Sequence, residues 1–506
     1  MARLDELHAL ITSLSQGEKR HFRRLLADLR KPGESQAIQL FDLLLRYPEY
    51  GKDGLMEKIH EAGLERHLAT TIPRLNSQVL KSVVHLRAEQ NVDAKLYQAL
   101  AEIKVLYGKH LYAQGMRMIK NARKVAREYS RSNIELELLS WERRFFIDSN
   151  PQATDEHLGK LRKEGQRLAD LLQLQMTLRQ MQSEARAAHR KGLSAANHAT
   201  EIGKFWRPEL FSQAIESGDG LAGLLAGSVQ GIYHTLQQDH ASAYEVLLEV
   251  MRLWEGKKNW VEDKAELLLI VFNNFFYAGI VATDDQGEIE HYLNLIRRIK
   301  FQDPVLQFRT RRIVYQQEFI YCLNFARRER GQGLAHRISS WLPEVKDRLS
   351  VSQWIMFHYN LTIFHFLSGN LSGAGRTIQE IKGLPAGPVR NDARRVAAIL
   401  HILVQYQYGH VDLCEPMLRN AKRNFGKQVK RDHPHLQVLE HCSGIIKALP
   451  GKELNQRFSG LIELFDQLPP FLGQQEVRLW ALSHLNGSTI WDEFRALVKA
   501  HQAAQG

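Results

Sequence analysis

Lysine and arginine residues at helical spacing are the side chains of this sequence whose pattern best suits binding chemistry. They form two stripes, at i, i+3, i+7, i+10 and at i, i+4, i+8, i+11: Arg117, Lys120, Lys124 and Arg127, continued by Arg131, and then Arg419, Arg423, Lys427 and Lys430. Each spacing places its residues on one face of a helix. A stripe of cations concentrates positive potential, so we expect both sets to bind an anionic partner.

The basic charge of the chain is concentrated around these stripes. Residues 103–127 and 416–431 contain no acidic side chain and together carry +13, whereas the net charge of all 506 residues is +12. A nucleic acid would be held mainly through its phosphates, because no arrangement of side chains suits the reading of bases. The alternative is a solvated helix face that acids from neighbouring helices neutralise. Gly426 could also end the second helix before its stripe is complete.

Several segments partly match motifs for metal or nucleotide binding, but their spacing or the neighbouring residues do not fit the structure that each motif requires. The segment from Gly218 to Gly223 matches G-x-G-x-x-G, but the residues before it favour a helix and not the strand that this fingerprint needs. His60 and His67 are too far apart for a helical zinc pair, and His435 and His441 would point in different directions from one helix. We therefore expect a non-enzymatic protein with no catalytic residues, no metal and no cofactor.

The cysteine content and the hydropathy of the chain indicate the cellular compartment of the protein. Cys322, Cys414 and Cys442 are the only cysteines and have no C-x-x-C spacing, which favours a reducing environment. The first ten residues contain Asp5 and Glu6 and no long apolar run, unlike a signal peptide. The most apolar stretch, residues 267–282, is shorter than a typical span and is better explained as a buried helix. We expect a soluble, cytoplasmic protein without a membrane partner; its oligomeric state stays open.

Helical periodicity extends along nearly the whole chain, so the predicted fold class is all-α. Prolines fall mainly between periodic segments, and Pro304 and Pro434 are predicted to occupy the first turn of a helix. Ser15 and Glu18 have the spacing of a capping box. Residues 1–90 are predicted to form an N-terminal helical domain, which includes a helix at 37–46.

Two further helices in this domain, at 55–62 and 67–87, could form a DNA-binding hairpin. The second would present its polar residues to DNA: Arg66, Thr70, Arg74, Ser77 and Lys81. Against this reading, Pro73 is expected to interrupt that helix. Any antiparallel helical hairpin would also show the same pattern.

Beyond residue 90 the pattern becomes repetitive. Tight turns are predicted near the following positions, which from Asp239 onward are 38 to 47 residues apart: His110, Asp239, Asp284, Gly331, Gly369, Gly409 and Pro450. Helical pairs at nearly constant spacing are typical of an α-solenoid, in which stacked neighbours build one core. We predict a solenoid over 91–449 and C-terminal capping helices over 450–506, with Trp480 and Trp491.

The clearest copy, residues 358–381, resembles a tetratricopeptide repeat (TPR). Its matching positions run through both helices of a pair: Leu361, Thr362, Gly369, Ala374, Ile378 and Ile381. The units are longer than the family's 34 residues, and the consensus Trp and Pro are missing. As a whole, the chain is similar to uncharacterised bacterial TPR-like proteins, a resemblance that implies no activity.

The TPR resemblance also suggests two partner-binding residues. In such proteins an asparagine on the first helix of a unit often faces the concave groove and binds the backbone of a peptide. Asn274 and Asn360 have this position, 86 residues apart. An asparagine bonded within the helix stack is the alternative.

Three functions remain open at this point. The first is a scaffold or adaptor that binds a partner protein or peptide in a concave groove. The second is a nucleic-acid- or ribosome-associated protein that uses the basic stripes. The third is a regulator with an N-terminal DNA-binding hairpin.

Overall fold

The computed structural model describes residues 2–505 with gaps at 29–33, 49–50, 89–90, 150–154, 192–205, 258, 284–285, 302, 386, 388, 428 and 430–432. Nearly all of the described residues are helical, and no strand occurs among them. This confirms the all-α prediction.

The chain divides into two compact units. Unit 1 contains residues 1–177 together with 219–221, and unit 2 contains residues 178–218 and 222–506. The division falls inside one long helix, α9 (Asp155–Lys191), after Thr177.

Unit 1 begins with five helices around an apolar core. They are α1 (Ala2–Ser13), α2 (Gln16–Asp28), α3 (Glu34–Arg46), α4 (Lys52–Glu61) and α5 (Leu68–Ala88). The predicted capping box opens α2: the Ser15 amide donates to Glu18 Oε2 at 2.8 Å, and the Glu18 amide donates to Ser15 Oγ at 3.3 Å. Phe22 on the apolar stripe of α2 is buried against Phe41 of α3.

The prediction that Pro73 interrupts a helix is wrong, because α5 runs through it without a break. Proline removes one backbone hydrogen bond and crowds the preceding turn. Pro73 lies near the start of α5 on its exposed side, and Leu75 and Val79, which follow it, are fully buried in the core. Burial of these side chains stabilises the helix despite the lost hydrogen bond.

The rest of unit 1 is a second helical group. It consists of α6 (Val92–Gly108), α7 (Tyr112–Glu128), α8 (Ser132–Ser149) and the first part of α9. α6, α7 and α8 pack on one another around Ile103, Ile119 and Phe145, which are all fully buried.

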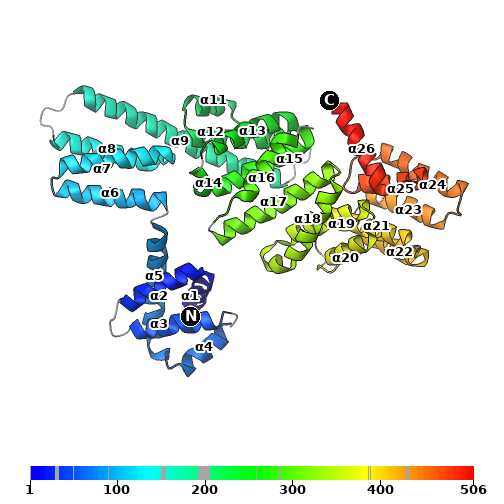
Figure 1. Ribbon diagram of the computed structural model, residues 1–506, viewed down its shortest axis with the longest axis horizontal. Coiled ribbons are helices and arrows are strands. Elements are labelled where there is room, and N and C mark those ends of the chain that lie inside the picture. The colour runs from blue at the N-terminus through cyan, green and yellow to red at the C-terminus, as the bar shows by residue number, and fades with distance from the viewer. Residues whose placement is uncertain are drawn as a thin grey trace. The chain divides into compact units, whose positions relative to one another are not determined.

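Unit 2 is a succession of helices that mostly pack against their neighbours in chain order (Figure 1). Its helices are α11 (Pro208–Glu216), α12 (Gly220–Leu236), α13 (His240–Glu255), α14 (Trp260–Asp263), α15 (Ala265–Ala282), α16 (Gln286–Arg298), α17 (Pro304–Asn324), α18 (Arg328–Trp341), η3 (Pro343–Arg348), α19 (Val351–Leu367), α20 (Leu371–Lys382), α21 (Asn391–Gln407), α22 (Val411–Gly426), α23 (Pro434–Lys447), α24 (Lys452–Gln467), α25 (Gln474–Asn486) and α26 (Ile490–Gln505). Pro304 and Pro434 open α17 and α23 as predicted.

Among the described residues, seven helix pairs are joined by the same three-residue turn, whose middle residue has a positive φ. These middle residues are His110, Ser130, Gly218, Gln238, Ala326, Gly369 and Gly409. In the α19–α20 turn the Asn370 amide donates to the His365 carbonyl at 2.8 Å, so an unpaired carbonyl at the helix end is satisfied. In each of these turns, the middle residue has a left-handed backbone conformation, and the chain reverses its direction there between the two helices.

The turn predicted near Gly331 is misplaced, because that glycine lies inside α18. A Cβ at Gly331 would fall 2.4 Å from the ring of Phe364, so glycine serves close helix packing at this position. The reversal is made by Ala326, with φ 48°. The turns predicted at His110, Gly369 and Gly409 are confirmed, and Asp284 lies outside the described residues.

The predicted best repeat copy is a tightly packed hairpin of α19 and α20. Leu361 and Ala374 are buried at the crossing, and Thr362 Oγ1 lies 2.8 Å from Thr377 Oγ1 of the facing helix. Small side chains therefore let the two helices nest, as the pattern predicts.

α15 contains the apolar stretch noted in the sequence. In the described part of the chain it is the one helix long and apolar enough to cross a membrane by length and composition, and half of that window is buried in the structure. Phe272, Phe275 and Phe276 are fully buried. Such burial is typical of a core helix.

The C-terminal helices return to contact earlier helices of unit 2. Trp491 of α26 packs edge-on against Phe364 of α19, with ring centroids 6.0 Å apart. Trp480 of α25 packs in the same way against Tyr406 of α21, at 5.7 Å. One face of α19 and of α21 is therefore covered by the end of the chain.

Candidate functional site

The first cationic stripe lies along α7 in unit 1 and is divided into two parts. Arg117, Lys120 and Lys124 are exposed, and no acidic side chain of the described residues pairs with them. Arg127 is half-exposed but pairs with Glu135 of α8, at 2.5 Å, and with Glu164 of α9. Three of the four predicted residues thus keep their charge available, whereas the fourth is neutralised within the fold.

A buried ion network lies directly beneath this stripe. Arg123 of α7 pairs with Glu142 and Glu135 of α8 and, at 2.6 Å, with Glu164 of α9. Burial opposes the charged form of Glu164, but the hydrogen bond from Arg123 and the charges of Arg123 and Arg127 lower its pKa below the usual range. The network joins three helices and is structural.

The second stripe lies on α22 in unit 2. Arg419 is exposed, with Glu415 3.9 Å away, and Arg423 donates to Asn420 Oδ1 at 3.2 Å. α22 ends at Gly426, so Lys427 caps the helix and Lys430 lies outside the described residues. The two stripes therefore belong to different units.

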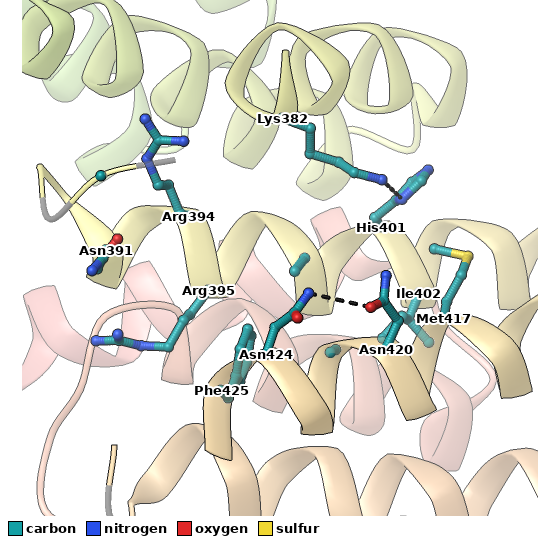
Figure 2. A pocket seen from close by; sticks show the side chains of 13 residues that line it. Lys382, Asn391, Arg394, Arg395, His401, Ile402, Met417, Asn420, Asn424 and Phe425 are labelled. Atoms are coloured by element: carbon teal, nitrogen blue, oxygen red, sulfur yellow. Dashed lines mark hydrogen bonds between the residues drawn. The ribbon is translucent and has the colours of Figure 1, made fainter. Parts of the chain in front are cut away.

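A cavity of about 280 Å³ opens between α20, α21 and α22, beside the second stripe (Figure 2). Its polar lining is basic or neutral: Lys382, Arg394, Arg395, His401, Asn391, Asn420 and Asn424. Ile402, Met417 and Phe425 contribute apolar walls, and no Asp or Glu lines the cavity.

Lys382 and His401 form one side of this cavity. Lys382 Nζ lies 3.3 Å from His401 Nδ1, as Figure 2 shows. Burial, reinforced by the charge of Lys382, lowers the pKa of His401 to about 4. His401 is therefore neutral near pH 7 and accepts a hydrogen bond from the ammonium group, which leaves the positive charge of Lys382 in place.

Two arginines lie on the opposite part of the cavity. Arg394 donates to the carbonyls of Val389 and Pro385 at 3.3 and 3.2 Å, which holds its guanidinium against the loop before α21. Arg395 Nε is buried and has no hydrogen-bond partner among the described residues. Burial lowers the pKa of Arg395, and the charge of Asp392 opposes this shift.

The orientation of Asn420 is determined by its neighbours. Its Oδ1 accepts from Arg423 Nη2 at 3.2 Å and from Asn424 Nδ2 at 3.3 Å. The amide oxygen is therefore occupied, and Nδ2 is left to donate. Figure 2 shows this nitrogen on the side of Asn420 that lies toward His401.

The two predicted partner-binding asparagines lie on α15 and α19 of unit 2. The side chains of Asn274 and Asn360 are half-buried, and the described part of the structure offers neither a hydrogen-bond partner. The neighbouring Asn273 is instead bonded to Gln317 of α17, at 2.7 Å. Asn273 is therefore bonded within the helix stack, whereas Asn274 and Asn360 are not.

The other candidate motifs lie in ordinary helical surroundings. Gly218 is the turn between α11 and α12, so the element directly before it is a helix and not a strand. Across the described residues, no group of three or more His, Cys, Asp or Glu side chains could hold a metal ion. His441 Nδ1 lies 3.1 Å from the Gln437 carbonyl of its own helix.

The predicted N-terminal hairpin corresponds to α4 and α5. A 3-10 turn, η1 (Glu65–His67), connects the two helices. Five polar residues predicted to face DNA are all exposed: Arg66, Thr70, Arg74, Ser77 and Lys81. Arg66 belongs to η1, and the other four lie along the side of α5 opposite the core residues Leu75 and Val79.

The sequence analysis missed the cavity, because its lining comes from three helices and a loop. The available signals were the pair Asn420 and Asn424, one helical turn apart, and the two adjacent arginines at the start of α21. Neither is specific until packing brings α20, α21 and α22 together.

Comparisons with known proteins give no relative: no protein-family model, no curated protein and no solved structure matches this chain.

Proposed function

We propose that the protein is a non-enzymatic, cytoplasmic scaffold, an α-solenoid of TPR-like hairpins that binds a partner protein or peptide. The observation that carries this proposal is the succession of helical hairpins in unit 2, several of which are joined by one recurring turn. Repeated hairpins of this kind offer long surfaces for many distributed contacts. The buried, unpaired thiols of Cys322, Cys414 and Cys442 suit a reducing compartment.

Asn274 and Asn360 are the residues that we assign to the partner. An amide side chain can donate to and accept from a peptide backbone at once, and both groups are unoccupied in the described structure. A partner that satisfied both amides would gain two pairs of hydrogen bonds per chain.

The double variant Asn274→Ala/Asn360→Ala is expected to lose at least about tenfold in affinity for the physiological partner, since several interfacial hydrogen bonds disappear. The partner is identified by affinity purification from the native host and mass spectrometry, and then titrated against purified variants. Asn455→Ala is the matched control, because Asn455 is an exposed asparagine on α24. Equal affinity of all three proteins would refute the assignment of these asparagines. A turnover activity that depends on one polar side chain would refute the scaffold.

A second function, association with nucleic acid, is favoured by the exposed part of the α7 stripe. Arg117, Lys120 and Lys124 keep three unneutralised charges on one helix face. Such a row suits phosphates, and its contribution would fall steeply with salt.

The variant Lys120→Glu/Lys124→Glu is expected to bind single-stranded RNA about tenfold more weakly than wild type at low salt, with a shallower salt dependence, because two phosphate contacts are lost. Fluorescence anisotropy at several salt concentrations measures both quantities. Arg162→Glu/Lys163→Glu is the control, as these two cations are exposed on α9 in the same unit. An equal loss in the control would mean that net charge, and not the stripe, attracts RNA.

A further inference from the structure

An open groove of about 490 Å³ lies between α6 and α7 of unit 1. Its lining comes from residues within 95–99 of α6 and within 114–125 of α7. Side chains two residues apart on a helix point in nearly opposite directions. Arg123 contacts α8, so Asn121 and Val125, which belong to the lining, lie on the side of α7 away from α8. The α6–α7 groove is therefore a surface that α8 leaves open.

The floor of the α6–α7 groove is apolar and consists of aliphatic side chains. Ala99, Met118 and Val125 are half-buried in it and keep part of their surface exposed. Removal of this surface from water favours an apolar ligand, and methionine adapts readily to its shape. Among the described residues that line the groove, none is aromatic. A nucleic-acid strand is typically held by bases that stack on aromatic rings, so the floor suits a protein segment better.

The lining of α7 follows the spacing of a helix face. Gln114, Met118, Asn121 and Val125 occupy i, i+4, i+7 and i+11, so the groove extends about 16 Å along α7. A second helix lying alongside would contact it over about three turns. Such a helix would present its own apolar residues at i, i+3, i+4 and i+7.

Cations lie on both sides of the apolar floor. Lys95 of α6 and Arg117 of α7 are exposed, and neither has an ion-pair partner among the described residues. The described lining contains no acidic side chain. Glu102, one turn after Ala99 on α6, accepts from Gln98 Nε2 at 2.9 Å and lies outside the lining. Positive charge on both sides complements a helix with acidic residues beside its apolar stripe.

We propose that the α6–α7 groove binds an acidic, amphipathic helix of a partner protein. The apolar stripe of this helix covers Ala99, Met118 and Val125, and its carboxylates pair with Lys95 and Arg117. The proposal rests on the scaffold function, because the ligand is a segment of a protein. It adds a contact surface in unit 1 to the asparagines of unit 2.

A fluorescent peptide of about 18 residues, or about five helical turns, tests the proposal. The peptide carries leucine at i, i+3, i+4 and i+7 and glutamate beside that stripe. One control peptide has the same composition in scrambled order, and a second has lysine in place of each glutamate. Anisotropy titration with the full-length protein is expected to show saturable binding of the acidic helix, at least about tenfold tighter than that of either control.

Reversal of the groove's charge should reverse its preference. Lys95→Glu/Arg117→Glu is expected to weaken binding of the acidic peptide by about tenfold or more and to favour the lysine peptide instead. Arg162→Glu/Lys163→Glu makes the same change in net charge at exposed positions of α9 and should keep the preference of wild type. Met118→Ser should weaken the acidic peptide about fivefold, because part of the apolar floor is lost. Circular dichroism confirms that each variant is folded.

Four results would overturn the proposal. The first two are equal binding of the acidic helix and its scrambled form, and an unchanged preference in Lys95→Glu/Arg117→Glu. The third is displacement of the peptide by a single-stranded RNA that binds the groove more tightly. The fourth is a dimer of this chain that the peptide dissociates, which would make a second copy the occupant. Each of them leaves the scaffold function standing, since that function is refuted instead by a turnover activity.

Discussion

Arg123→Met is expected to destabilise unit 1 by about 3–5 kcal/mol, the largest effect of any single substitution considered for this protein. Arg123 and Glu135 are both almost fully buried, with exposures of 8% and 3%. Methionine fills much of the arginine volume but leaves Glu142 without its buried counter-charge and Glu135 with Arg127 alone. Removing one partner of a buried ion network costs far more than the network contributes in net stability.

Hydrogen–deuterium exchange measures this destabilisation separately for each helix. Peptides from α7 and α8 should lose protection by two to three orders of magnitude in Arg123→Met, whereas peptides from α19 and α20 in unit 2 should be unchanged. The control is Arg117→Met, an exposed residue on the same helix without an acidic partner among the described residues. Similar protection in both variants would show that the network contributes little.

Replacement of both Arg123 and Glu142 should restore much of the stability that is lost in Arg123→Met. In Arg123→Met/Glu142→Leu one buried carboxylate disappears together with the arginine, so less uncompensated charge remains. Glu135 keeps its pairing with Arg127. We therefore expect the double variant to be more stable than Arg123→Met, with a coupling energy of about 1–3 kcal/mol between the two positions.

Local signals allowed much of the helical framework to be predicted from the sequence. The capping box of Ser15 and Glu18 and the helix-opening prolines at 304 and 434 act within one turn of backbone, so neighbouring residues determine them. The turns at Gly369 and Gly409 are equally local, because glycine readily takes a positive φ.

Features that depend on packing between helices could not be predicted in the same way. Alanine does not favour a positive φ, so the turn at Ala326 had no local signal, while Gly331 gave a misleading one. Pro73 continues a helix because of the core beneath it. In each case, contacts distant in sequence outweigh the local preference.

The same distinction governs the candidate sites. The spacing of the α7 stripe correctly placed Arg117, Lys120, Lys124 and Arg127 on one helix, but Arg131 lies in the turn after α7 and pairs with Asp93. Only the packing of α8 and α9 determines that Arg127 is neutralised and Lys120 is not. The cavity of unit 2 is a tertiary feature in every respect, since Lys382, Arg395 and Asn420 come from three different helices. Charge spacing predicts where cations lie, and packing determines which remain available.

Acidification is expected to destabilise unit 2 through its buried histidines, and His358 offers the clearest test. Its side chain is 7% exposed, lies against Trp354 and has no hydrogen-bond partner among the described residues. Burial, reinforced by the charge of Lys346, lowers the pKa of His358 from 6.5 to about 4. Between these two pH values the unfolded chain binds the proton and the folded chain does not. Stability therefore falls as the pH decreases from about 6.5 to 4.

His358→Phe removes this proton-linked loss. Relative to wild type, the variant should gain about 2 kcal/mol in stability between pH 7.5 and pH 5, because an unfolded-state histidine is mostly protonated at pH 5 and the buried one is not. Urea unfolding followed by tryptophan fluorescence at the two pH values measures the difference, since seven of the eight tryptophans belong to unit 2. Any constant packing effect of phenylalanine cancels between the two pH values. His336→Gln, at an exposed position on α18, should show a pH-dependent difference below about 0.5 kcal/mol. An equally small difference for His358→Phe would mean that the imidazole gains a proton in the folded state as easily as in the unfolded chain.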